Sequence, residues 1–264
     1  MLSKIVLGIF VILSFSFSSV YAVEPILITS SGVADKIIFD GKWSDNLEWK
    51  TSSYDQFHFA DDNSKIVLRS AHQDDFIYIQ INAVSDFTLD KGSDSATLCF
   101  DSKNDKSSIS KNDDYCFFTT LNGKNSFTYQ GGSPVSLNGN FKKIQNHKDY
   151  IAIGNVSGKY DRYDAKPHPT YEFKIPIDLL GRSDNYGFYF STFDANSYKK
   201  YSWPKQLDTS SPLKIPSPSQ WGDIISPDKS LPEFNYSIFL LFIIPIFLIT
   251  SFITKNRISK VYFH

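Results

Sequence analysis

The chain has 264 residues, a formal net charge of −1 and an aromatic content of 16%. The near-zero charge excludes the basic footprint of a nucleic-acid-binding protein. Two cysteines are too few for a disulfide-dense scaffold or a four-cysteine zinc site. Abundant aromatic and β-branched residues, with Gly and Asn at the breaks, favour β-sheet over helix.

The N-terminus has the pattern of a secretory signal peptide. Lys4 precedes an apolar run from Ile5 to Phe17, which is shorter than the roughly 20 residues that a bilayer span needs. Small residues close the segment at Ala22, and this predicts cleavage after Ala22. The alternative is an N-terminal anchor that stays uncleaved.

Period-2 alternation dominates the middle of the chain. In residues 76–83, Ile77, Ile79 and Ile81 fall on one face while Gln80 and Asn82 fall on the other, which predicts a half-buried strand. Similar runs occur at Ile66–Ala71, Ser126–Gln130, Tyr150–Val156, Tyr171–Ile175 and Tyr186–Phe193. No helical period is sustained, so we expect an all-β fold, an antiparallel, jelly-roll-like β-sandwich.

Both cysteines lie in two apparent strands, Thr97–Asp101 and Tyr115–Leu121, joined by a polar loop. A hairpin centred near residues 107–108 places Cys99 directly opposite Cys116. Because an exported protein can keep a disulfide, we predict a cross-strand bridge between them. The alternative is a pair of buried free thiols.

The loop between these strands is rich in oxygen ligands. The candidate metal ligands are Asp101, Asn104, Asp105, Asp113 and Asp114. Carboxylate and amide oxygens at this density suit calcium. Three lysines in the same loop offset the charge, so a solvated polar hairpin loop is the alternative.

A series of landmarks follows in one order along the chain. They are Phe39-Asp40-Gly41-Lys42-Trp43-Ser44, Trp49, Asp75-Phe76-Ile77-Tyr78-Ile79, Asp86, the acidic loop, Tyr171-Glu172-Phe173-Lys174-Ile175-Pro176, Leu179-Leu180-Gly181, Trp203-Pro204 and Trp221-Gly222. In this order and spacing, residues 36–226 resemble a family 9 carbohydrate-binding module. The resemblance implies a non-catalytic β-sandwich that binds sugar through exposed aromatics and holds structural calcium.

Sugar binding needs a flat apolar platform and polar groups for the hydroxyls, and the resemblance directs the search to exposed aromatics. The candidate ligand-binding residues are Trp203, Tyr201, Tyr198 and Trp221, with Arg69 and Asn82 as hydrogen-bonding partners. Core packing is an open alternative for Trp203. It is the favoured alternative for Trp221, which falls on an apparent closing strand.

Motifs of catalysis are missing from the sequence: it has no nucleophile elbow, no His-Glu-x-x-His and no phosphate loop. We therefore predict that the chain is not an enzyme. A haem-binding, electron-transferring branch of the same superfamily typically uses an axial Met, but the one Met here is the initiator. Haem is accordingly disfavoured, and a structural cell-envelope protein without sugar binding is the other alternative.

One acceptor sequon, Asn155-Val156-Ser157, lies near a strand end and predicts glycosylation of Asn155. A second, at Asn235, abuts the apolar C-terminal segment and is a poor acceptor.

The C-terminal region has the features of a membrane anchor. Residues 236–254 carry no charge, and at 1.5 Å per residue they approach the roughly 30 Å of a bilayer core. Lys255, Arg257 and Lys260 follow, so the tail is expected in the cytoplasm and the bulk of the chain outside. A buried core helix is the alternative.

The junction Leu231-Pro232-Glu233-Phe234, followed by an apolar span and a basic tail, resembles the Pro-Glu-Phe sorting signal of archaeal surface proteins. Asn235 stands where that family usually has Gly. The resemblance implies that a sortase-like enzyme cleaves near Pro232 and transfers the protein to a lipid; otherwise the span stays.

The expected organisation places the protein at the cell surface. It comprises a signal peptide at 1–22, a lead-in at 23–35, the sandwich at 36–226, a linker with the sorting junction at 227–235, a transmembrane helix at 236–254 and a basic tail at 255–264. The expected partners are a glycan, the membrane and the processing enzyme.

Overall fold

The computed structural model describes residues 23–60, 62–123, 125–135, 139–205 and 214–227. The expected signal peptide, sorting junction and transmembrane helix lie outside these residues. Within the described ranges, no helix is long and apolar enough to cross a membrane.

Nearly all regular elements are β-strands. They are β1 (Ile26–Leu27), β2 (Thr29–Ser30), β3 (Ser53–Phe59), β4 (Ser64–Gln73), β5 (Phe76–Asn82), β6 (Ser95–Asp101), β7 (Asp114–Thr120), β8 (Ser126–Gln130), β9 (Lys142–Ile144), β10 (Ile151–Val156), β11 (Pro169–Pro176), β12 (Asn185–Asp194), β13 (Lys199–Trp203) and β14 (Gly222–Ile225). The helical elements are short: η1 (Ala34–Lys36), α2 (Ile177–Leu180) and η3 (Pro218–Gln220).

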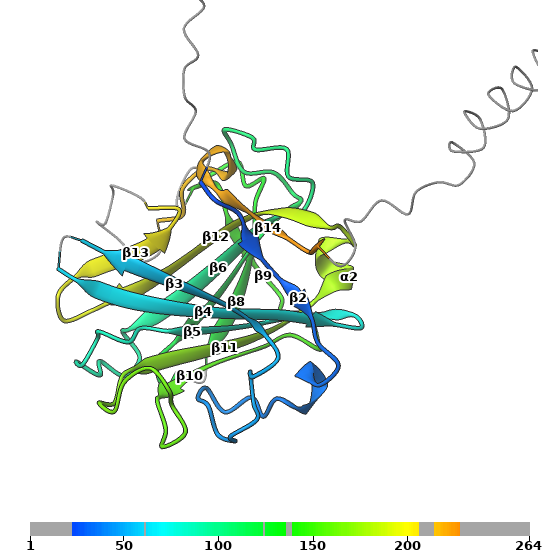
Figure 1. Cartoon of the computed structure of the whole chain (residues 1–264). Coiled ribbons are helices and arrows are strands. Elements are labelled where there is room, and N and C mark those ends of the chain that lie inside the picture. Colours follow the sequence, from blue (N-terminus) through cyan, green and yellow to red (C-terminus); the bar gives the residue numbers. More distant parts are fainter. Residues whose placement is uncertain (1–22, 61, 124, 136–138, 206–213, 228–264) are drawn as a thin grey trace, which may run out of the picture.

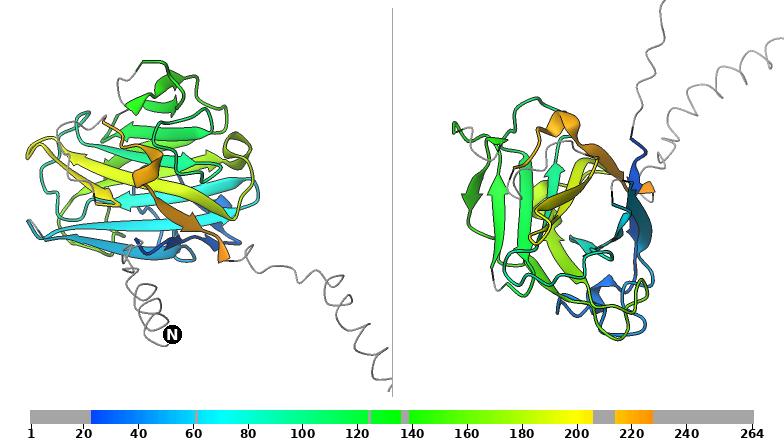
Figure 2. Two further views of the ribbon diagram at one scale, coloured as in Figure 1. Left: turned by 90° about the horizontal axis from the view of Figure 1, so that it is seen from above. Right: turned by 90° about the vertical axis from the view of Figure 1, so that its left-hand side faces the viewer.

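These strands form two sheets that pack as a β-sandwich (Figures 1 and 2). The eight-stranded sheet has the order β1-β14-β12-β6-β7-β8-β9, with β13 paired to β12. The six-stranded sheet has the order β10-β11-β5-β4-β2, with β3 paired to β4. Two short pairs, β1 with β14 and β2 with β4, are parallel, so the sandwich is mixed rather than purely antiparallel. Both involve residues 23–35, so the expected lead-in contributes strands to the sandwich.

The period-2 alternation of the strands builds one core between the sheets. Phe100 and Phe188 of the eight-stranded sheet are fully buried with Ile79 and Phe173 of the six-stranded sheet in one apolar cluster. Alternate strand residues point to the same face, so each of these strands lines the core with every second side chain. The expected strands in this region are confirmed.

The outer face of the six-stranded sheet is also covered, and the expectation of a half-buried strand at 76–83 is therefore wrong. Gln80 and Asn82 are fully buried although they point away from the core. The loop of residues 38–52 packs over them: the Trp49 Nε1 donates to Glu172 Oε1 at 2.8 Å, and the Gly41 N–H donates to Glu172 Oε2 at 2.9 Å. Glu172 is thus a structural acceptor.

The disulfide between Cys99 and Cys116 is present, as predicted. The two residues are directly paired across β6 and β7, because the connecting hairpin keeps the two strands in register. Their side chains lie on the outer face of the eight-stranded sheet with Phe141 and Tyr189, in a second apolar cluster. The bridge therefore fixes the register of two neighbouring strands under a covering layer.

Candidate ligand-binding cleft

Trp203 does not present an exposed platform; of the two alternatives left open for it, its burial favours core packing. Its side chain is only 8% exposed and belongs to the main core. The indole lies 6.2 Å from the ring of Phe57 and 6.1 Å from that of Phe188, measured between centroids. Trp203 closes the core at β13, and core packing is its role in this fold.

Trp221 is buried as well, on the other side of the eight-stranded sheet. Its ring stacks near Phe141 and Tyr189, both at 6.3 Å, and its Nε1 donates to the carbonyl of Pro216 at 3.1 Å. The side chain is only 4% exposed and so offers no open ring face to a ligand. Core packing, the favoured alternative for Trp221, is therefore the role that the fold supports.

The two predicted tyrosines lie at the β12–β13 hairpin. Tyr198 is 62% exposed, whereas Tyr201 is half-buried and donates to Asp62 Oδ2 at 2.7 Å. Lys199 Nζ lies 2.7 Å from the same oxygen. Burial would raise the pKa of Asp62, but the hydrogen bonds from Lys199 and Tyr201 hold it well below its usual range. Tyr198 is thus the predicted aromatic with a free ring surface.

Arg69 and Asn82, the predicted polar partners, lie on the outer face of the six-stranded sheet. Asn82 is closed off from solvent: its Nδ2 donates to Gln80 and its Oδ1 accepts from Thr170. Arg69 is partly exposed, and its neighbour across β3 is Tyr54. The predicted residues therefore fall in separate parts of the molecule. The aromatic residues that surround Arg69 are not the predicted ones.

Arg69 lies at the centre of a cluster of aromatic rings. Its guanidinium lies 5.0 Å from the ring of Tyr54 and 5.4 Å from that of Trp43, and its Nε donates to the Tyr163 hydroxyl at 2.7 Å. Tyr54 and Tyr163 are stacked, with centroids 6.2 Å apart and 23° between the ring planes. Tyr54 remains 47% exposed. A cation held over aromatic faces fixes the direction in which those rings point.

The loop of residues 157–168, between β10 and β11, is held in shape by buried polar contacts. Asp161 accepts from the N–H groups of Tyr163 and Asp164 at 2.8 and 3.2 Å, and its Oδ2 lies 3.5 Å from His168 Nε2. Burial opposes ionisation of Asp161, but His168 and these N–H groups lower its pKa. Asp161 therefore orders the backbone that carries Tyr163.

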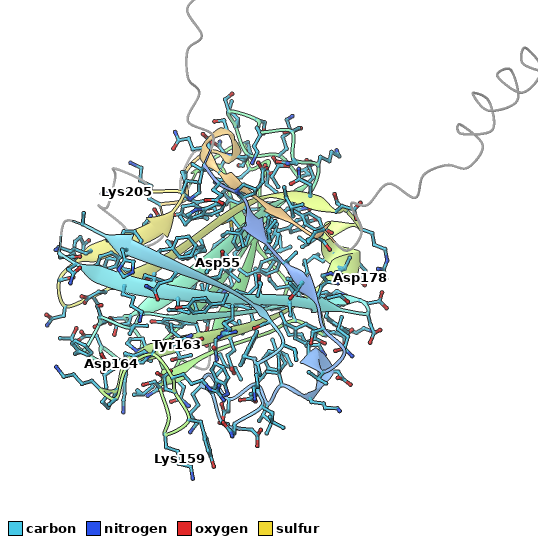
Figure 3. All side chains as sticks on the ribbon, in the orientation of Figure 1. Asp55, Lys159, Tyr163, Asp164, Asp178 and Lys205 are labelled. Atoms are coloured by element: carbon cyan, nitrogen blue, oxygen red, sulfur yellow. A yellow bond between two sulfur atoms is a disulfide. The ribbon has the colours of Figure 1, made fainter. Side chains whose placement is uncertain are left out.

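A polar cleft of about 650 Å³ opens in this loop. It is lined by Ser157, Gly158, Lys159, Asp161, Arg162, Tyr163, Asp164, Ala165 and Pro167. Figure 3 labels Lys159, Tyr163 and Asp164 in this region. The guanidinium of Arg162 lies 4.8 Å from the Trp43 ring and donates to the Asn46 carbonyl at 2.6 Å. The cleft combines charged donors and acceptors with an aromatic edge.

A second cavity, of about 450 Å³, lies on the other side of the covering loop. Apolar side chains such as Val33, Ile38 and Leu47 line it together with polar ones such as Asp45 and Lys50. Trp49, the aromatic residue of the lining, is only 3% exposed and so offers no ring face to a sugar. The polar cleft is therefore the better candidate for a sugar.

The acidic loop does not bring three of its carboxylates to one point. In the described part of the chain, such a convergence occurs at Asp86, Asp94 and Asp194 instead. The loop's own lysines take up much of its charge, because Asp105 pairs with Lys111 at 2.6 Å.

Asp113 lies 3.7 Å from Lys103 Nζ, and Asp114 accepts from the Lys111 N–H at 2.5 Å. Asp101 Oδ1 and Asn104 Oδ1 are buried without a hydrogen-bond partner. Asp113 Oδ2 is likewise buried without a hydrogen-bond partner, and burial together with the neighbouring carboxylates raises the pKa of Asp114 to about 7. Calcium in this loop stays a prediction.

Asn155, the predicted glycosylation site, lies on β10 and is partly buried. Its Nδ2 donates to the Asp40 carbonyl at 2.8 Å and so ties β10 to the covering loop. This nitrogen is the atom that a glycan would modify, so a glycan there would have to fit between β10 and the covering loop. Glycosylation of Asn155 stays a prediction, opposed by this contact.

Sequence reasoning missed Tyr163, which lines the cleft, and Tyr54, which stacks on it. Tyr54 alternates with Gln56 and His58 along β3, and all three are exposed. That alternation is a signal that a search for exposed aromatics on edge strands could have used. Tyr163 lies 94 positions from Arg69 in a loop without strand periodicity, so its contact depends on the fold alone.

No protein-family model and no curated protein matches the chain. Among solved structures, a family 9 carbohydrate-binding module from Caldicellulosiruptor kristjanssonii in complex with glucose is similar at 14% identity and a TM-score of 0.45, over 80% of this chain and 100% of that chain. A family 9 module from the same organism in complex with cellotriose is similar at 13% identity and a TM-score of 0.44, over 79% of this chain and 98% of that chain. Likeness at this level assigns neither family nor ligand.

Proposed function

We propose that the chain is a non-catalytic glycan-binding module displayed at a cell surface, with its ligand site at the polar cleft beside Tyr54 and Tyr163. The observation that carries the proposal is the partly exposed Tyr54 ring, which Arg69 holds and which stacks on Tyr163, a residue that lines the cleft. The sequence resemblance to family 9 carbohydrate-binding modules points to the same class of ligand.

The chemistry of a sugar explains why this arrangement suits it. A pyranose ring has apolar C–H faces, which pack on an aromatic ring, and an equatorial rim of hydroxyls, which need donors and acceptors. Tyr54 offers the ring, while Lys159, Arg162 and Asp164 line the adjacent cleft. Asp161 already orders the loop and Arg69 already orders the rings. Binding would therefore cost little additional conformational entropy.

The ends of the sequence support display outside the cell. A signal peptide at 1–22, a helix at 236–254 and the basic residues after it would export the domain and retain it at the membrane. The Pro-Glu-Phe junction at 232–234 adds a possible route by which a sortase-like enzyme exchanges the helix for a lipid. In both cases the cleft works on the outer side.

A glycan array followed by affinity electrophoresis on the purified full chain tests the proposal. The array identifies a bound polysaccharide, and the gel compares the parent with Tyr54→Ala. Loss of one stacking ring is expected to cost about 1.5 kcal/mol, which is roughly a tenfold weaker Kd. The exposed ring of Tyr54 does not pack against core side chains, so Tyr54→Ala should leave the fold intact.

Tyr198→Ala is the matched control, since it removes an exposed tyrosine at the β12–β13 hairpin, which the sequence favoured. We expect Tyr198→Ala to bind like the parent. If Tyr198→Ala weakens binding and Tyr54→Ala does not, the site lies at the β12–β13 hairpin. If no glycan retards the parent, the chain is not a glycan-binding module and the envelope-protein alternative takes its place.

A further inference from the structure

Arg162, which lines the polar cleft, is held in place without an acidic partner. Its guanidinium lies 4.8 Å from the Trp43 ring, and its Nη2 donates to the carbonyl and to the side-chain oxygen of Asn46 at 2.6 and 2.7 Å. In the described part of the chain, its Nε and Nη1 have no hydrogen-bond partner, and the side chain forms no ion pair. A guanidinium fixed in this way offers free donors in a planar fork, and a carboxylate fits that geometry.

Two lysines add positive charge beside Arg162. Lys159 lines the cleft and is exposed, with its ammonium 4.8 Å from the Tyr160 ring. Lys42 reaches the cleft from the covering loop, since a Cβ on Gly158, a lining residue, would lie 3.4 Å from Lys42 Cδ. Neither lysine forms an ion pair with a described carboxylate. Three cations without an acidic partner therefore gather at one cleft.

The carboxylates of the cleft do not balance this charge. Asp161 has a side chain that is only 4% exposed, and its oxygens are engaged by His168 and by the N–H groups of Tyr163 and Asp164. Asp164 is the one exposed carboxylate of the described lining. Three cations against one exposed carboxylate give the cleft a positive potential, which a concave surface concentrates.

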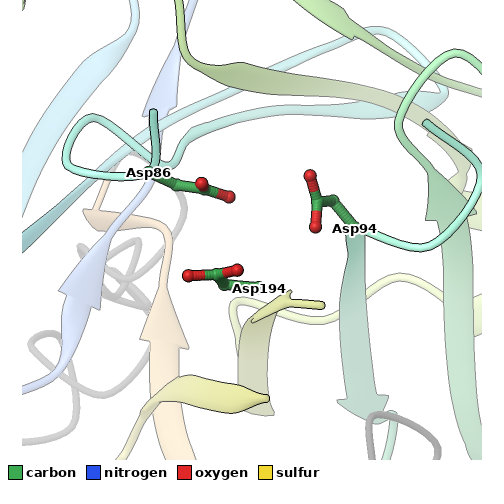
Figure 4. A group of neighbouring side chains, drawn as sticks. All are labelled: Asp86, Asp94 and Asp194. Atoms are coloured by element: carbon green, nitrogen blue, oxygen red, sulfur yellow. The ribbon is translucent and has the colours of Figure 1, made fainter. Parts of the chain in front are cut away.

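The aspartate cluster formed by Asp86, Asp94 and Asp194 does not cancel that potential. Its carboxylates point toward one another, with one oxygen of each within 4.8 Å of those of the other two (Figure 4). Asp86 and Asp194 line a different, small cavity, which Lys65 also lines. Burial raises the pKa of Asp86 to about 7 and that of Asp94 to about 6, so the cluster is not fully ionised at neutral pH.

We propose that the glycan of the polar cleft is acidic: its sugar carries a carboxylate, as a uronic acid does, and this carboxylate accepts from Arg162 with Lys159 and Lys42 beside it. The inference rests on the glycan-binding function proposed above and names its class of ligand. A uronic acid has an apolar ring face for Tyr54 and a planar anion for the guanidinium. Hydrogen bonds between charged groups are stronger than those to a hydroxyl, so the cleft prefers acidic over neutral sugars.

Affinity electrophoresis of the full chain with matched acidic and neutral polysaccharides tests the class of ligand. The acidic probes are polygalacturonate, alginate and hyaluronate, each beside its carboxyl-methylated ester. Hydroxyethylcellulose and neutral xylan extend the neutral set, and dextran sulfate measures attraction to charge alone. We expect at least one polyuronate to bind about tenfold or more tightly than its ester, because the ester keeps the sugar ring but loses the anion. This preference should shrink as NaCl is raised from about 50 to about 500 mM.

Arg162→Gln should weaken polyuronate binding about tenfold and leave binding of the ester nearly unchanged, because it removes the charged fork. Arg162→Lys keeps the charge without the fork and should bind with an intermediate Kd. Arg182→Gln is the matched control. It removes one positive charge beyond the far end of β11, where Arg182 pairs with Asp75, and it should bind like the parent.

The outcomes separate this inference from the function on which it rests. If a neutral glycan binds as tightly as the acidic ones, and Tyr54→Ala weakens binding while Arg162→Gln does not, the acidic ligand is refuted and the glycan-binding function stands. If no probe retards the parent, both fail. If dextran sulfate binds as tightly as every polyuronate, and Arg162→Gln and Arg182→Gln weaken binding equally, the attraction is to charge alone and the inference is overturned.

Discussion

Glu172 shows how one buried side chain organises the outer face of the six-stranded sheet. Besides Trp49 and Gly41, it accepts from the Gln80 Nε2 at 3.2 Å. Burial raises the pKa of Glu172 to about 8, more than these hydrogen bonds lower it. In the unfolded chain the same carboxyl titrates near its ordinary value of 4.5. The covering loop is thus coupled to the protonation of one group.

This coupling predicts a pH-dependent stability. Between about pH 4.5 and 8 the unfolded chain releases the Glu172 proton while the folded chain keeps it, so the free energy of unfolding falls as pH rises. Glu172→Gln does not titrate and should lose less stability across this window, by a few kcal/mol. Urea unfolding at pH 5, 6.5 and 8 measures it, and parallel profiles for parent and variant would rule the coupling out.

The residue types in the sequence did not show which side chains lie together. Arg69 was predicted from its place on the polar side of a strand, and it contacts Tyr163, which lines the cleft. Trp203 was chosen for its polar and aromatic neighbourhood, but its ring faces the core because β13 pairs with β12 in that register. The direction of a side chain depends on strand register, which one sequence does not fix.

At the scale of elements, apolar alternation was a sufficient guide for several strands that face the core. The expected runs at 66–71, 126–130 and 186–193 correspond to β4, β8 and β12. β3 was missed because Asp55 interrupts the apolar face formed by Phe57 and Phe59. Short strands such as β1 and β9 carry too few residues to show a period.

The pairing of β6 with β7 gives a prediction about the disulfide. Cys99 and Cys116 are separated by 17 positions, and a loop of this length restricts the unfolded chain by roughly 3 kcal/mol. The double variant Cys99→Ala, Cys116→Ala should therefore unfold at a lower guanidinium concentration, with little change in slope. Reduction of the parent should give a similar loss; equal midpoints for all three proteins would contradict it.

At the scale of the whole molecule, the loop between β10 and β11 carries the polar cleft and meets strand β3 where Tyr163 stacks on Tyr54. The sandwich itself followed from composition and periodicity. The candidate site did not, because Arg69 of β4, Tyr54 of β3 and Tyr163 of the loop are brought together only by the three-dimensional fold. The aspartate cluster is a second example, since Asp194 lies far along the chain from Asp86 and Asp94.

Attachment of the whole protein to the membrane is a prediction of its own. Expressed in its natural type of host, the full chain should sediment with membranes, whereas a chain ended after Pro227 should appear in the medium. The physical reason is the apolar segment at 236–254, whose transfer from lipid to water is strongly unfavourable. A full chain found in the soluble fraction would contradict the anchor.

Hydrogen exchange of the full chain, with and without the glycan that the array identifies, tests the central claim most directly because it locates the ligand. We predict new protection in the loop of residues 157–168 and along β3, and unchanged exchange at the β12–β13 hairpin. Ordering of backbone N–H groups by the ligand would slow their exchange there first. Protection confined to the hairpin around Tyr198, or found nowhere, would contradict the assignment of the cleft.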